Sequence, residues 1–226
     1  MDKKIIKDII QWDVRSWKKA FDFWEKNVEW EKVHTCLELG AQQGGLSLWL
    51  SLKGKKTVCS DLSGIKEKAE PLHNKYAVQN LITYQDIDAT NIPYENHFDV
   101  IVFKSIIGGI SRENADVQQK IFKQIHKALK KDGKLLFAEN TKASALHQRL
   151  RKKYVKWGNS WRYVSLEEMK NGLKDFSSVE MHSTGVLGTL GRTENQRNFL
   201  SAIDKIALNA ISPKKWKYIC YGVAQK

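Results

Sequence analysis

Residues 36–45 read Cys-Leu-Glu-Leu-Gly-Ala-Gln-Gln-Gly-Gly, an apolar stretch that ends in a glycine-rich turn. An apolar helical run follows, and a second apolar stretch then ends in Asp61. Glycine is needed where a chain turns sharply off a strand and lies against a ligand, because a Cβ there would clash. The pattern predicts a strand, a turn, a helix and a second strand, with the Asp61 carboxylate where a ribose diol would lie.

The spacing of this turn separates two classes of nucleotide ligand. A dinucleotide fingerprint is Gly-x-Gly-x-x-Gly and receives a pyrophosphate at the helix N-terminus, whereas here Gly40 is followed by Gly44 and Gly45. Glu38 ends the strand, and a carboxylate there would repel a pyrophosphate but attract a ligand with an ammonium group. The turn therefore favours S-adenosylmethionine (SAM) over NAD. A dinucleotide oxidoreductase is the alternative that this turn leaves open.

The segment resembles motif I of the class I SAM-dependent methyltransferases, whose pattern is acid-x-Gly-x-Gly-x-Gly. Glu38, Gly40 and Gly44 match it, and Gln42 replaces the middle glycine. Later stretches resemble further landmarks of the family in the same order: an Asp-Ala pair and an Ile-Pro pair within 84–93, an apolar strand at 98–103, and a helix end, turn and strand at 129–137. The resemblance covers residues 33–140. It implies an α/β fold, a Rossmann-like seven-stranded, mostly parallel sheet with helices on both faces and an antiparallel last strand.

The resemblance also implies which residues hold the cofactor, because ligands of open α/β sheets lie beyond the carboxyl ends of the strands. The methionine portion would lie at the first turn, the ribose at the second strand's end, the adenine at the third and the methyl group at the fourth. The residues for the methionine portion are Glu38, Gly40, Ala41, Gln42 and Gly44, and those for the ribose are Asp61 and Leu62. Asp88 and Ala89 would contact the adenine, and Lys104 and Ser105 would lie near the methyl group. Asp86 is a rival of Asp88 for the adenine contact.

A general base matters mainly if the acceptor is a hydroxyl, because methyl transfer depends chiefly on aligning the nucleophile with the donor sulfur. His147 follows the fifth strand, in the region where the family places its acceptor, and imidazole accepts protons near neutral pH. Glu139 and Lys104 are alternative bases, and Lys104 would need a strongly lowered pKa. A solvated surface role is the competing interpretation of His147.

Hydrophobic periodicity predicts the remaining elements. One or two amphipathic helices within 2–29 form an N-terminal extension over the cofactor side of the sheet. Strands are expected over 34–40, 56–61, 82–87, 99–104, 133–139, 179–187 and 217–224. Helices are expected over 44–53, 64–80, 114–131 and 194–211, and a short helix is expected to begin at the capping box of Ser165 and Glu168. We expect a single domain over 1–226, made of a helical cap at 1–30, the cofactor-binding core at 33–140, and an acceptor-side and closing part at 141–226.

Composition supports one soluble domain of enzyme size. The 226 residues are 42% hydrophobic with three prolines, enough chain to bury one core without a proline-rich linker. We expect a cytoplasmic location, because the start lacks the apolar core of a signal peptide and no run approaches the ~18 apolar residues of a membrane span. Cys36, Cys59 and Cys220 lie in predicted strands as small buried side chains, and no metal-ligand spacing is present.

The net charge of +13 predicts an anionic neighbour. Residues 142–174 hold nine Lys or Arg and two acids, interleaved with aromatic rings that would suit phosphates and stacked bases or sugars. A solvated lysine-rich face is the alternative. The residues that we expect near the acceptor are Trp12, Trp17, Arg149, Trp157, Arg162 and Tyr163.

These features favour methyl transfer from SAM, leaving S-adenosylhomocysteine, to a hydroxyl of a small molecule or saccharide that can carry phosphate. Residues 12–17 and 44–50 resemble uncharacterised bacterial methyltransferases associated with surface polysaccharide synthesis. RNA is a less favoured acceptor, because the chain has no appended RNA-binding module and its fourth strand lacks the Asn/Asp-Pro-Pro-aromatic motif of base methyltransferases. A SAM-binding regulatory protein without catalysis is a further alternative.

Overall fold

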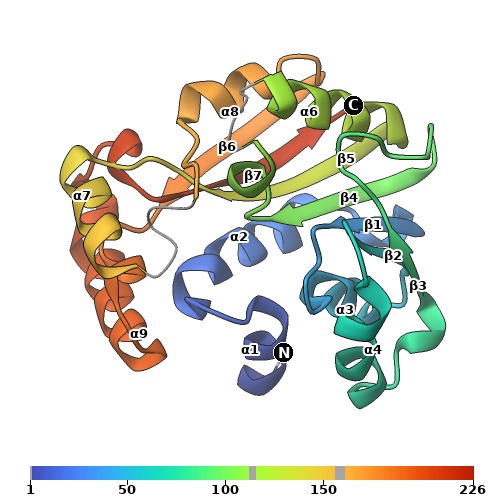
Figure 1. The fold of residues 1–226 in the computed structure, drawn as a ribbon, viewed down its shortest axis with the longest axis horizontal. Helices are drawn as coiled ribbons and strands as arrows, with labels where there is room; N and C mark the ends of the chain where they lie inside the picture. Colours follow the sequence, from blue (N-terminus) through green and yellow to red (C-terminus); the bar gives the residue numbers. More distant parts are fainter. Residues whose placement is uncertain (1, 112–115, 156–160) are drawn as a thin grey trace.

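The computed structural model describes residues 2–111, 116–155 and 161–226, and these form one seven-stranded sheet with helices on both faces (Figure 1). The strands are β1 (Thr35–Leu39), β2 (Lys56–Asp61), β3 (Ile82–Asp86), β4 (Phe98–Lys104), β5 (Leu129–Asn140), β6 (Ser178–Thr184) and β7 (Ile219–Gln225). Their order is β3-β2-β1-β4-β5-β7-β6. Strands β1 to β5 pair in parallel, and β7 runs antiparallel to β5 and β6. The predicted Rossmann-like fold with an antiparallel last strand is confirmed.

Two helical layers bury the faces of this sheet. The α-helices are α1 (Lys3–Ile10), α2 (Val14–Asn27), α3 (Gly45–Leu52), α4 (Ile65–Lys75), α5 (Ile107–Ile110), α6 (Asp116–Ala128), α7 (Ala145–Tyr154), α8 (Leu166–Gly172), α9 (Glu194–Ile203) and α10 (Asn209–Ile211). A π turn, η4 (Asp204–Leu208), joins α9 to α10. Short 3-10 turns are η1 (Trp30–Lys32), η2 (Gln79–Leu81), η3 (Gly188–Leu190) and η5 (Lys214–Trp216). Helices α2, α3 and α4 pack on one face, and α6 and α8 on the other (Figure 1). Among the described residues, no helix is long and apolar enough to span a bilayer.

Two predicted elements end earlier than their apolar pattern indicates. The helix expected over 64–80 ends at Lys75, because Ala77 adopts a left-handed φ of 54° that a helix cannot contain. The strand expected over 179–187 ends at Thr184, where the following glycine has a φ of 80°. In both places a local left-handed turn overrides continuous hydrophobicity.

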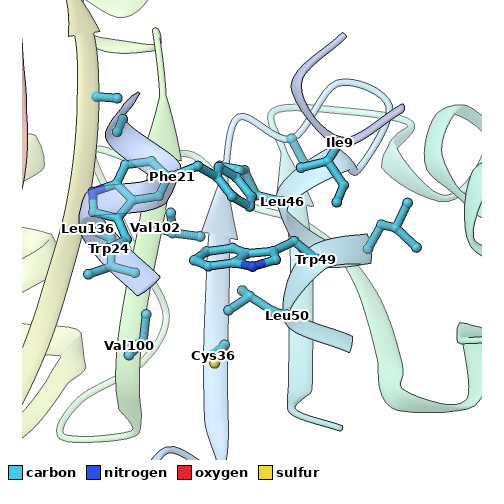
Figure 2. Close-up of a cluster of buried hydrophobic side chains, with 14 of the residues drawn as sticks. Ile9, Phe21, Trp24, Cys36, Leu46, Trp49, Leu50, Val100, Val102 and Leu136 are labelled. Atoms are coloured by element: carbon cyan, nitrogen blue, oxygen red, sulfur yellow. The ribbon is translucent and has the colours of Figure 1, made fainter. Parts of the chain in front are cut away.

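The N-terminal helices form a cap that packs on the sheet through aromatic rings. Trp17, Phe21 and Trp24 are spaced three or four residues apart on α2, so they share one buried face. Figure 2 shows Trp49 of α3 between Phe21 and Leu50, and the Phe21 and Trp49 ring centroids lie 4.3 Å apart. The Trp24 indole donates a hydrogen bond to a β7 carbonyl at 3.0 Å. The cap is therefore part of the main core and holds the sheet's ligand side.

Trp49→Ala is expected to lower the free energy of unfolding by about 3–5 kcal/mol, because it empties a fully buried site between the cap and the sheet. Leu52→Ala, three residues on at the end of the same helix and 39% exposed, is the matched control and should cost less than about 1 kcal/mol. Urea denaturation followed by circular dichroism measures both. Equal losses in the two variants would contradict the cap's role in the core.

Candidate functional site

The candidate site lies at the carboxyl ends of β1 and β4, where the strand order changes direction. From β1 the chain proceeds to β2 on one side, while β4 lies on the other, and such a switch point leaves a crevice for ligands. A cavity of about 350 Å³ opens there. Its walls come from the cap (Ile9, Gln11, Trp12), the first turn and helix (Glu38, Gly40, Ala41, Gln42, Gly45, Leu46), the ends of β4 and β5 (Lys104, Ser105, Asn140) and Trp161.

The glycine turn requires glycine at two positions for different reasons. Gly40 has a φ of 64°, and a Cβ on it would collide with the Ile106 side chain. A Cβ on Gly45 would collide with the Ile9 carbonyl oxygen, so the cap backbone lies directly on the turn. Gln42, which stands in place of a motif glycine, has a φ of 51° and is exposed. The turn therefore keeps its left-handed shape without that glycine, at a conformational cost.

Two carboxylates, those of Asp61 and Glu38, hold the turn by accepting backbone hydrogen bonds. Asp61, at the end of β2, accepts the Gln42 backbone N–H at 2.8 Å through one oxygen and the Leu62 N–H at 2.7 Å through the other. Glu38 is buried and accepts the N–H groups of Leu46 and Ser47 at the start of α3, together with the Ser47 hydroxyl. Burial raises the pKa of Glu38 to about 7, against those hydrogen bonds. Its negative charge faces the positive end of α3.

Lys104 connects the end of β4 to the cap. Its ammonium donates to the Ile10 carbonyl at 2.6 Å and lies 5.3 Å from the ring centroids of Trp12 and of Trp17. Burial lowers the pKa of Lys104 to about 8, opposed by the charges of Asp13 and Glu38. The cavity thus contains one titratable amine with a pKa close to neutral pH.

The residues predicted for the ribose and adenine flank the cavity and do not line it. Leu62 is 70% exposed beside Asp61. Asp88 is exposed and accepts the Thr90 N–H, and Ala89 is buried. The rival Asp86 accepts two N–H groups at the start of α4. Both carboxylates are exposed, but that of Asp86 is engaged at the start of α4.

Of the three bases predicted from the sequence, Lys104 lines the cavity, whereas His147 and Glu139 do not. His147 is buried on α7, stacked 5.5 Å from Tyr218, and burial with the nearby Arg151 charge lowers the pKa of this histidine to about 3. Glu139 is fully buried and accepts the N–H groups of Ile106 and Ile107 at the start of α5. Each side chain therefore has structural contacts in place of contact with the cavity.

The predicted acceptor residues divide in the same way. Trp12 lines the cavity, whereas Trp17 is buried in the core behind it. Arg149 is exposed on α7. Arg162 forms an ion pair with Glu168 and donates a hydrogen bond to a serine hydroxyl. The ring centroid of Tyr163 lies 4.0 Å from the guanidinium carbon of Arg151. Trp157 lies outside the described residues. The basic segment 142–174 is thus partly internal, because Arg151 is buried and donates to the Thr141 carbonyl.

Six lining residues were not predicted as site residues from the sequence: Ile9, Gln11, Gly45, Leu46, Asn140 and Trp161. Asn140 ends β5 and donates to the Ser105 hydroxyl at 2.6 Å. The rule that site residues lie at carboxyl ends of strands could have found it. Ile9, Gln11 and Trp161 carry no such signal, because they reach the cavity only through packing of distant segments.

The order of the strands and the cavity at the glycine turn define a Rossmann-like α/β protein of the methyltransferase fold. Residues 15–178 match the family described as "Methyltransferase domain", and the chain belongs to this family. A comparison with curated proteins gave no match.

Solved structures share the fold at low sequence identity. Phosphoethanolamine N-methyltransferase 2 of Haemonchus contortus, in complex with S-adenosyl-L-methionine, is 19% identical with a TM-score of 0.64; the match covers 93% of this chain and 52% of that one. A putative sarcosine dimethylglycine methyltransferase from Galdieria sulphuraria is 15% identical with a TM-score of 0.63, over 92% and 85% of the two chains. This chain spans about half the length of the Haemonchus protein.

Gln42→Gly is expected to raise the free energy of unfolding by up to about 1 kcal/mol, because relief of the left-handed strain exceeds the extra entropy of glycine in the unfolded chain. Gln43→Gly is the control, since Gln43 has no positive φ, and it should cost about 0.5–1 kcal/mol. Thermal and urea unfolding measure both. Destabilisation by Gln42→Gly as large as that of the control would show that the turn is not strained.

Proposed function

We propose that this chain binds SAM in the cavity at the glycine turn and transfers its methyl group to a hydroxyl of a small molecule or saccharide. The observation that carries the proposal is the hydrogen bond between Asp61 and the backbone of Gln42, which brings a carboxylate from β2 against the turn of β1. The Haemonchus protein of the same fold has been solved in complex with S-adenosyl-L-methionine, and also with S-adenosylhomocysteine.

The residues around the turn fit the three parts of such a donor. Asp61 retains lone pairs for a ribose diol after accepting two backbone N–H groups. The exposed Leu62 offers an apolar surface to an adenine ring, with Asp88 and Ala89 at its edge. Gly40 lines the cavity together with Glu38, so the methionine portion would lie along its backbone near that charge. When bound, SAM would supply an electrophilic methyl group on its sulfonium.

The remaining lining suits a neutral, hydroxyl-bearing acceptor. Trp12 and Trp161 offer ring faces, and Gln11 and Asn140 offer amides that both donate and accept hydrogen bonds. Sugar rings present apolar C–H faces and hydroxyl edges, which such a mixture complements. Among the described residues of the lining, Glu38 is the one carboxylate and is engaged by α3, so an ammonium acceptor finds no free counter-charge from them. A saccharide linked to surface polysaccharide synthesis would fit this site.

Lys104 is the side chain that we propose as proton acceptor for the hydroxyl. It lines the cavity, and its neutral amine would still donate one N–H to the Ile10 carbonyl while presenting a lone pair. A lowered pKa makes this neutral form available near physiological pH. His147 and Glu139 would require movement of buried elements to reach the same place.

RNA methylation and SAM binding without catalysis are the competing functions. Neither has a supporting contact of its own: part of the basic segment is buried, and the cavity lining includes a titratable amine that a purely regulatory site has no need of. Both remain open to the same assay. Radiolabelled methyl transfer across neutral sugars, phosphorylated sugars and RNA would separate them.

Isothermal titration should detect binding of SAM and S-adenosylhomocysteine and no binding of NAD. Asp61→Ala is expected to weaken SAM affinity by about tenfold to a hundredfold, the usual value of a hydrogen bond to a charged group. Glu95→Ala, an exposed carboxylate away from the cavity, is the control and should leave affinity unchanged. Binding of NAD in place of SAM would reject the methyltransferase proposal. Undiminished SAM affinity in Asp61→Ala would reject the ribose contact alone.

Once the acceptor is found, kcat/KM should rise with pH and level off above a pKa of about 8, because the neutral form of Lys104 is the base and exists above its pKa. Lys104→Met should lower kcat by about a hundredfold or more. Lys104→Arg should not restore it, since a guanidinium does not release its proton at these pH values.

SAM affinity is the control for these variants and should be retained or increased, because a cation near a sulfonium is removed in Lys104→Met. Full activity in Lys104→Met, or a pH profile without the limb near 8, would exclude Lys104 as the base.

A further inference from the structure

Large apolar side chains are exposed along one segment of the chain, from α9 to η5. Their exposed fractions are 68% for Phe199, 82% for Ile206, 77% for Ile211 and 48% for Trp216. Phe199 lies in α9, and Ile206 lies in the π turn that directly continues it. Ile211 and Trp216 follow at the end of the same segment. Four large apolar side chains exposed within one short segment indicate a contact surface.

The charges of this segment have one sign at the surface. Residues 192–217 contain six Lys or Arg and two acids. Both acids are used internally: Glu194 accepts the backbone N–H groups of Asp13 and Val14, and Asp204 is buried and accepts those of residues 186–188. Lys205, Lys214 and Lys215 are exposed beside the apolar side chains. The surface therefore combines cations and apolar groups, with no exposed carboxylate in this segment.

The fold holds this segment in place. Asp204 opens the π turn and is anchored in the interior, which directs its neighbours Lys205 and Ile206 outward. At the other end of the segment, Lys217 is buried and donates to the Asn209 carbonyl. Arg192, just before α9, lies over the ring of Tyr154 at the end of α7, 5.5 Å away. These contacts hold the segment in place, and its α9 lies next to α7 at one end of the sheet (Figure 1).

Further lysines continue the cationic surface around η5. A hollow of about 760 Å³ lies between α8 and β6. Its lining shares Lys214 and Lys215 with the segment, adds Lys170 and Lys174, and includes apolar groups such as Phe176. No acid is present among the lining residues that the structure describes. Four lysines around an apolar floor extend the same combination of chemistry.

We propose that the segment 199–216, with the lysines of η5 and the adjoining hollow, is a docking surface for an anionic lipid bilayer. Apolar side chains entering the acyl boundary and lysines at the lipid phosphates are the two contributions that hold proteins on such membranes. An exposed tryptophan beside lysines matches the polar and apolar halves of the interface. A second copy of this chain is disfavoured, because its own lysines and a net charge of +13 would repel. This proposal does not rest on the proposed function.

Sedimentation with vesicles tests it, using the full chain with phosphatidylcholine alone or mixed with an equal part of phosphatidylglycerol. We expect binding to the anionic vesicles only, weakened by added salt. Lys214→Glu with Lys215→Glu should lower the partition coefficient by at least about thirtyfold, since each basic residue lost accounts for about 1 kcal/mol and the added carboxylates are repelled. Ile206→Asp with Ile211→Asp should abolish binding.

Lys66→Glu with Lys68→Glu is the matched control, because it changes the net charge equally on α4, at the opposite edge of the sheet. It should retain most of the binding, and circular dichroism should show that every variant is folded. Failure of the wild-type chain to bind anionic vesicles would overturn the proposal. So would equal losses in the control, or a dimer in sedimentation velocity that Ile206→Asp with Ile211→Asp dissociates, which would identify the surface as an interface between copies.

Discussion

The cavity depends on the hydrogen bonds that the buried Glu38 carboxylate accepts at the start of α3. They join the end of β1 to the first turn of the helix, so the glycine turn between them is held at both ends. That position places the Gln42 N–H against Asp61 and brings Gly45 under the Ile9 carbonyl. A carboxylate without these partners would be costly to bury, and the interaction therefore fixes both the turn and the charge beside it.

The N-terminal cap closes the cavity beside the glycine turn. Lys104 donates a hydrogen bond to the Ile10 carbonyl, and the buried Asp13 accepts one at 2.6 Å from Tyr218, which directly precedes β7. The cavity is thus closed by residues more than twenty positions away from the motif that defines it. The same packing buries His147 against Tyr218, which accounts for a histidine in the acceptor region that lies outside the cavity wall.

Sequence patterns predicted the sheet and half of the site, and the limits have a physical cause. The turn from Glu38 to Gly44 and the carboxylate of Asp61 are local features, set by backbone conformation within a few residues, and a sequence pattern is therefore able to predict them. Asn140 was missed although it ends a strand, while Glu139 beside it was selected; alternation along β5 points adjacent side chains to opposite faces, and only the pairing with β4 decides which face meets the cavity.

The sequence by itself determined the βα alternation, the glycine turn and the family, because hydrophobic period and glycine spacing act over short range. The tertiary structure decided which charged groups are buried and which remain at the surface. Lys104 became a cavity amine under two tryptophans, Arg151 became an interior cation, and Ile206 remained exposed although helical spacing alone makes it a core candidate. Burial and pKa depend on the neighbours supplied by distant segments, and no local pattern in the chain specifies those neighbours.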